Sequence, residues 1–152
     1  MKLFILTAAL SLGLNAMAAT SNPVINPTVN EKVLKTFHQV FADAKNVQWK
    51  ATAEYNEASF NSGAIAARAI IDNNGKLVRT IRYYKETNLP SNILYKVKSK
   101  YEGKEVYGVT EITNDAGTAY EIVMRDSQKM YTVHIDANGA LTQTGKFKRG
   151  DL

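Results

Sequence analysis

The sequence predicts an α+β protein, a tandem α-β4 repeat whose antiparallel sheet of about eight strands carries two helices packed on one face. Two stretches have apolar residues at helical spacing, and each is followed by four short stretches in which apolar and polar residues alternate. Short turns rich in Gly, Asn and Asp separate the alternating stretches and favour antiparallel neighbours. The motif Asp-x-Asn-Gly at 72–75 recurs 64 positions later at 136–139, which indicates an internal repeat.

The first residues have the pattern of an export signal. A positive charge at Lys2 precedes an apolar run, and Ala16-Met17-Ala18 follows as a cleavage site. The apolar run is shorter than the roughly 20 residues that span a bilayer. We therefore expect residues 1–18 to be a signal peptide cleaved after Ala18 and residues 19–27 to be a flexible leader. The mature protein is then periplasmic or secreted, without stable membrane insertion; an uncleaved N-terminal helix is the alternative.

Composition excludes several kinds of site. Cleavage would leave 152 − 18 = 134 residues, enough for a single domain over 28–152. The chain has no cysteine, which excludes disulfides, thiolate metal sites and a thiol nucleophile. Without Lys2, 18 basic residues stand against 14 acidic ones, a formal charge of 18 − 14 = +4. Because basic and acidic residues are interspersed, we expect no nucleic-acid partner.

The first half is predicted to begin with a helix at Thr28, where Thr28-Val29-Asn30-Glu31 fits a capping box. Val33, Phe37 and Val40 then recur at helical spacing, and the helix is expected to end near Ala44. From Val47 apolar residues occur at every second position instead of at helical spacing, which is typical of strands. The strands expected in this half are 47–52, 55–61, 64–71 and 76–84.

The second half repeats this order. Leu89-Pro90 is a favourable helix start, and Ile93, Val97 and Tyr101 form an apolar stripe that ends before Gly103. This stripe lies 64 positions after an equivalent stripe in the first helix, so we expect duplicated units at 28–86 and 87–152. The alternative is that Asp-x-Asn-Gly is only a common hairpin turn. The strands expected in this half are 105–113, 118–125, 129–135 and 140–147.

The chain resembles a PepSY-like domain protein, in particular the tandem form grouped with β-lactamase-inhibitor-like proteins. The resemblance covers Thr28 to Phe147 and rests on Leu89-Pro90, the Tyr101-Glu102-Gly103 helix end, four strands and the Asp-x-Asn-Gly hairpins. The first unit lacks the Leu-Pro start. The resemblance implies an exported, non-enzymatic module whose relatives are suspected of binding or inhibiting proteins such as peptidases, and it assigns no binding residue.

The residue pattern predicts no catalytic residue, no metal site and no cofactor. His38 lies in the first predicted helix and His134 in a strand near the end, so the two histidines form no evident ligand cluster. Nucleophile-elbow, phosphate-loop and zinc-hydrolase motifs are absent from the sequence. Carboxylates such as Glu111 are expected to be solvated. Asp72-Asn73-Asn74-Gly75 lacks the downstream acidic ligand of a calcium loop and is interpreted as a hairpin.

One face of the predicted sheet is a candidate binding surface. If Ile71, Leu77 and Ile135 face the helices, strand alternation sends a second set of residues to the opposite face. Two helices cannot cover both faces of about eight strands, so that opposite face is expected to be open. Arg, Tyr and Met are favoured at protein interfaces; the alternative is that these residues merely tolerate water. The predicted binding residues are Arg68, Arg82, Tyr84, Met130, Thr132 and His134.

The first functional hypothesis is therefore a protein-binding module whose partner is another exported or envelope protein, with a peptidase or other enzyme as the restrained target. A second hypothesis is a binder of envelope polysaccharide or a small ligand, in which Trp49 and tyrosines stack on the ligand. An unrecognised enzyme ranks last because no nucleophile–base pair is evident. The oligomeric state is left open by the sequence.

Overall fold

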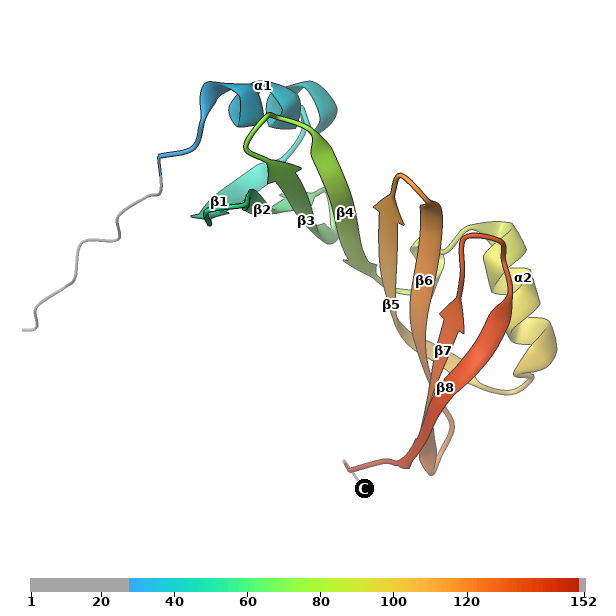
Figure 1. Ribbon diagram of the computed structural model, residues 1–152. Coiled ribbons are helices and arrows are strands. Elements are labelled where there is room, and N and C mark those ends of the chain that lie inside the picture. Colours follow the sequence, from blue (N-terminus) through green and yellow to red (C-terminus); the bar gives the residue numbers. More distant parts are fainter. Residues whose placement is uncertain (1–27, 151–152) are drawn as a thin grey trace, which may run out of the picture.

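The computed structural model describes residues 28–150, which fold into one eight-stranded sheet and two α-helices (Figure 1). The predicted signal peptide and leader lie in residues 1–27, outside the described residues. Within 28–150, no helix has the length and apolar character needed to cross a membrane.

Every strand pairs with its sequence neighbours in antiparallel orientation, so the sheet order is β1 to β8 without a crossover. This confirms the predicted α+β class, the eight-stranded antiparallel sheet and its two helices. The elements are α1 (Glu31–Val40), β1 (Lys45–Ala51), β2 (Tyr55–Ser62), β3 (Ile65–Asp72), β4 (Leu77–Tyr84), the 3₁₀ turn η1 (Glu86–Asn88), α2 (Ser91–Lys100), β5 (Glu105–Asn114), β6 (Gly117–Arg125), β7 (Lys129–Ile135) and β8 (Leu141–Lys148).

Helix α1 is shorter than predicted at both ends. Its N-cap is Asn30, whose side chain accepts a hydrogen bond from the Lys32 amide at 2.8 Å, so the predicted Thr28 cap is wrong. The helix ends at Val40, which is 51% exposed and does not belong to the buried stripe. Phe41 leaves the helical conformation and packs its ring on Phe37, at a centroid distance of 5.3 Å.

Helix α2 begins directly after the predicted Leu89-Pro90 start. Pro90 is the N-cap residue, where its missing N–H costs no helical hydrogen bond, and Leu89 is buried. Ile93 and Val97 face the sheet as predicted. The chain turns after Tyr101 at Gly103, whose φ of 72° favours glycine.

The buried apolar residues form two clusters, one beneath each helix. Burial of these side chains is the main favourable contribution to folding. The first cluster joins α1 to β2 and β3 through Val33, Phe37, Ala58, Phe60, Ala67, Ala69 and Ile71. The second joins α2 to β4–β7 through Tyr84, Leu89, Ile93, Val97, Tyr101, Val106, Val109, Tyr120, Ile122, Met124, Tyr131, Val133 and Ile135.

Both helices lie on the same face of the sheet. Directly opposed residues share a face, and one such row runs from Phe60 through Ala67 on β3 to Tyr120 on β6. Its first members lie under α1 and its last under α2. Within residues 28–150 no helix covers the other face, which we call the open face. Residues on this face include Glu57, Ser59, Arg68, Ile70, Arg79, Ile81, Tyr83, Gly108, Thr110, Ile112, Glu121, Val123, Arg125, Met130, Thr132 and His134.

A β-bulge in β4 overturns part of the predicted face assignment. Ile71 pairs with Leu77 but Ile70 pairs with Arg79, so Val78 is an extra residue on β4. One extra residue reverses the alternation for the rest of the strand. Arg82 therefore lies opposite Ala67 and Glu111, and Tyr84 opposite Val109, on the helix face. The prediction that Arg82 and Tyr84 lie on the open face is wrong.

Candidate functional site

The open face carries four of the six residues predicted from the sequence, in two separate groups. Arg68 lies on β3, whereas Met130, Thr132 and His134 lie on β7. Four strand spacings separate β3 from β7, or roughly 19 Å at about 4.8 Å per spacing. A site that uses both groups must therefore be an extended surface.

Arg68 organises the first group. Its Nε donates to the Tyr83 hydroxyl at 3.0 Å, its guanidinium lies 5.3 Å from the Tyr83 ring centre, and it pairs with Glu57 at 3.5 Å. The hydrogen bond to Tyr83 raises the pKa of Arg68, a side chain that is charged at every physiological pH. Tyr83 is an open-face residue that sequence reasoning missed, because the bulge at Val78 exchanges the faces of Tyr83 and Tyr84.

The second group is polar at one end and apolar at the other. His134 Nδ1 lies 2.6 Å from Glu121 Oε1. Met130 lies opposite Phe147, which is 59% exposed. A Cβ atom on Gly145 would stand 2.6 Å from the Phe147 ring, so the glycine lets the ring lie close over the strand. The apolar end of this group thus has a defined shape.

A half-buried apolar centre separates the two groups. Ile81 and Ile112 lie directly opposite each other on β4 and β5, and Val123 on β6 lies two open-face positions further along the sheet, opposite Gly108. The charged pairs of Arg68 and of His134 lie on either side of this centre. An apolar centre with a polar rim is the usual composition of a protein-binding surface. Sequence alternation could have located Ile112 and Val123, but the alternation of β4 is interrupted at Val78, which hides the position of Ile81.

A hollow of about 580 Å³ lies where β4 ends and β5 continues. We call it the β4 notch. Tyr83 opposite Thr110, and Gly108 opposite Val123, bring open-face positions to its lining. The full lining is Ala64, Tyr83, Tyr84, Lys85, Thr87, Asn88, Tyr107, Gly108, Val109, Thr110 and Val123.

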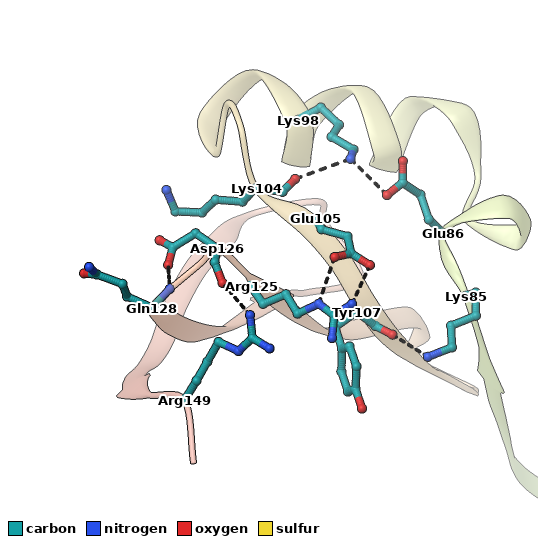
Figure 2. A network of polar contacts seen from close by, with 10 residues as sticks. All are labelled: Lys85, Glu86, Lys98, Lys104, Glu105, Tyr107, Arg125, Asp126, Gln128 and Arg149. Atoms are coloured by element: carbon teal, nitrogen blue, oxygen red, sulfur yellow. Dashed lines mark hydrogen bonds and ion pairs between the residues drawn. The ribbon is translucent and has the colours of Figure 1, made fainter. Parts of the chain in front are cut away.

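Cations hold Tyr107 at the border of the notch (Figure 2). Lys85 Nζ donates to the Tyr107 carbonyl oxygen at 2.7 Å and lies 4.6 Å from its ring centre. The Arg125 guanidinium also lies 4.6 Å from the ring centre and forms two hydrogen bonds with Glu105, at 2.8 and 3.0 Å. This bidentate ion pair fixes the Arg125 guanidinium, which in turn restrains the Tyr107 ring.

The remaining contacts in Figure 2 hold α2 to η1 and to the start of β5, and order the β6–β7 turn. Lys98 bridges Glu86, at 2.9 Å, and the Lys104 carbonyl oxygen, at 3.4 Å. At the β6–β7 turn, the pKa of Asp126 is lowered to about 2, mainly by a hydrogen bond from the Gln128 amide and then by one from the Tyr131 hydroxyl. These contacts have a structural role.

A second polar cluster lies on the helix face, where β4 meets β5. Glu111 accepts from Arg82 Nη1 at 2.9 Å and from the Tyr84 hydroxyl at 2.5 Å. Burial, followed by the hydrogen bond to Glu111, raises the pKa of Tyr84. Glu111 is only 8% exposed, so the prediction that this carboxylate is solvated is wrong. The cluster links the strands that join the two halves of the sheet.

The described residues contain no group of three or more His, Asp or Glu side chains placed to hold a metal ion. His38 is exposed on α1, and His134 is on the open face.

Comparison with solved structures establishes the fold. A BLIP-like protein from Bacteroides fragilis has a TM-score of 0.61 and 17% identity, over 80% of this chain and 89% of that one. A DUF2874 family protein from Bacteroides ovatus has a TM-score of 0.60 and 17% identity, over 80% and 88%. A protein from Bacteroides eggerthii, described as a candidate periplasmic protein, has a TM-score of 0.58 and 13% identity, over 79% and 88%. The fold is thus BLIP-like, in agreement with the β-lactamase-inhibitor-like resemblance.

No protein-family model matches the sequence. No curated protein matches it either.

Proposed function

We propose that this chain is an exported, non-enzymatic module that binds another exported or envelope protein through the open face. The observation that carries the proposal is the apolar centre around Ile81 and Ile112, which charged side chains flank and no helix within 28–150 covers. The BLIP-like fold, which inhibitor-like proteins share, makes a peptidase or another exported enzyme the target we favour. The periplasmic description of one structural neighbour supports the export of this chain.

The aromatic residues favour a protein over a polysaccharide as the ligand. Trp49 lies opposite Ala58 on the helix face, where its ring packs edge-on against Phe37 at 5.1 Å. Tyr83 and Tyr107 already have cations of this chain over their rings. Sugars bind by stacking on free aromatic faces, and Trp49, Tyr83 and Tyr107 are already engaged within this chain.

We further propose that units 28–86 and 87–152 are copies of one PepSY-like unit within a single domain. In each half the helix holds the turn of the last hairpin: Thr36 donates to the Gly75 carbonyl oxygen at 2.6 Å, and Lys96 Nζ donates to that of Gly139. Gly75 and Gly139 are 64 residues apart, which is the spacing of the sequence repeat. Superposition of the two halves with the helices and four strands in register would support duplication, and a register that fails beyond the hairpins would contradict it.

Cross-linking capture tests the binding surface. The chain without residues 1–18 is incubated with periplasmic extract of the producing bacterium, and cross-linked partners are quantified by mass spectrometry. Ile81→Arg and Val123→Arg should each reduce recovery of a partner at least about tenfold, because a buried charge at an interface centre costs more than 1.4 kcal/mol. Val40→Arg, at an exposed position of α1, is the matched control. Equal recovery with all three variants would refute the open face as the binding surface.

A further inference from the structure

The β4 notch is a hollow because one strand ends early and its neighbour has a glycine at the same level. β4 stops at Tyr84, whereas β5 continues outward to Glu105. A Cβ atom built on Gly108 meets no other atom within 4 Å, so the space above this residue is open. Its φ is not in the left-handed region, so the backbone there does not require glycine. The glycine leaves room that any side chain would fill.

The walls of the notch are held in place before anything binds. The Tyr83 hydroxyl accepts from Arg68, and the Tyr107 backbone and ring are held by Lys85 and Arg125. A site whose side chains are already ordered loses less conformational entropy on binding. Tyrosine is enriched among the residues that contribute most to protein–protein binding, and such residues lie in pockets from which binding excludes water.

The residues that line the β4 notch indicate which chemical groups of a partner it can accept. Val109, Val123 and the two tyrosine rings are apolar surface, and the hollow of about 580 Å³ has the size of sites that take small ligands, about 300–1,000 Å³. The Lys85 ammonium lies at the border and forms no ion pair with a carboxylate within residues 28–150. A carboxylate from a partner would complement this charge.

On the premise of the proposed function, we infer that the β4 notch receives an apolar side chain of the partner protein whose neighbouring residue is acidic and pairs with Lys85. The notch then supplies the anchor of the open-face interface, and the apolar centre around Ile81 and Ile112 supplies the area that surrounds it. The occupant is an exposed loop of an exported protein in which an aromatic residue or leucine is next to Asp or Glu.

A peptide titration tests the inference without knowledge of the partner. The probe is Ac-Gly-Phe-Asp-Gly-NH₂, added to ¹⁵N-labelled protein lacking residues 1–18. We expect saturable chemical-shift changes centred on the amides of Gly108, Thr110 and Val123. The peptide Ac-Gly-Phe-Lys-Gly-NH₂ should bind about two- to fivefold more weakly, the range for an exposed ion pair. Absence of saturable shifts at these amides, or equal affinity for both peptides, would overturn the inference.

Two variants separate the anchor from the charge. Gly108→Leu fills the notch and should weaken probe binding at least about tenfold, whereas Thr142→Leu, which adds the same side chain at an exposed position of β8, should leave it unchanged. Lys85→Gln keeps a donor for the Tyr107 carbonyl but removes the charge, and it should abolish the preference for the acidic peptide. Lys50→Gln is the matched control on β1. Unchanged binding by both notch variants would contradict the inference.

The capture experiment distinguishes failure of this inference from failure of the proposed function. Loss of partner with Ile81→Arg but full recovery with Gly108→Leu would leave the open face as the interface and refute the notch as its anchor. Full recovery with both variants would refute both. Loss with both variants, while Val40→Arg on α1 retains the partner, is the expected result.

Discussion

Replacement of Tyr84 by phenylalanine should destabilise the protein by about 2 kcal/mol. The change removes the hydroxyl that donates to Glu111 at 2.5 Å, in a place where both residues are buried. A hydrogen bond to a charged group contributes about 1.5–3 kcal/mol. Arg82 stays at 2.9 Å from the same carboxylate, which prevents the larger loss of a buried charge without a partner.

Glu111→Leu should cost about 3 kcal/mol, because both the Tyr84 hydroxyl and Arg82 then lose their acceptor. In the double variant Tyr84→Phe/Glu111→Leu no hydroxyl is left without an acceptor, so we expect a total of about 3 kcal/mol rather than the additive value of about 5. Urea unfolding of the four proteins, followed by circular dichroism, measures this coupling of about 2 kcal/mol. Additive costs within about 0.5 kcal/mol would refute the contribution we assign to the cluster.

Alkaline pH tests the same cluster independently. The pKa of Tyr84 is raised in the folded protein, so above about pH 10 the folded state holds a proton that the unfolded chain has released. The free energy of unfolding should therefore fall as pH rises past 10, by up to about 1.4 kcal/mol per pH unit from this residue. Tyr84→Phe should make the pH dependence shallower. An identical alkaline slope in both proteins would contradict the assignment.

Three further predictions concern stability. Phe37→Ala, which removes the ring at the centre of the first cluster, should cost about 3–5 kcal/mol in urea unfolding; a cost below about 1 would contradict this packing. Gly75→Ala should destabilise more than Gly139→Ala, because a Cβ at Gly75 would stand 2.9 Å from a backbone oxygen, while at Gly139 it meets only a flexible lysine end at 3.1 Å; equal melting temperatures would refute the difference. The pKa of Asp126 is lowered to about 2, so stability present above about pH 4 should be lost as pH falls toward 2, and Asp126→Asn should remove that acid dependence.

The fold was predictable because local patterns agree with the tertiary structure. Strand alternation and Asp-x-Asn-Gly turns placed all eight strands, and the apolar stripes placed both helices. The ends of α1 were the exception. Asn30 competes with Thr28 as a cap, and only the packing of Phe41 against the core shows where the helix stops.

The candidate site was less predictable because it depends on register and on distant partners. Nothing in the residues 77–84 marks Val78 as a bulge, since valine also fits a regular strand. The resulting phase change moved Arg82 and Tyr84 to the helix face and Tyr83 to the open face. The burial of Glu111 could not be predicted, because its partners Arg82 and Tyr84 are 29 and 27 residues away in the sequence. Local sequence pattern carries no information over that separation.

Methyl cross-saturation by NMR tests the central claim most directly. The deuterated, methyl-labelled chain is bound to the partner recovered by cross-linking, and saturation transfer from that partner is measured. We predict strong transfer to the methyl groups of Ile81, Ile112 and Val123 on the open face, and none to Val40 on α1. Transfer to Val40 with none to the three open-face residues would contradict the account.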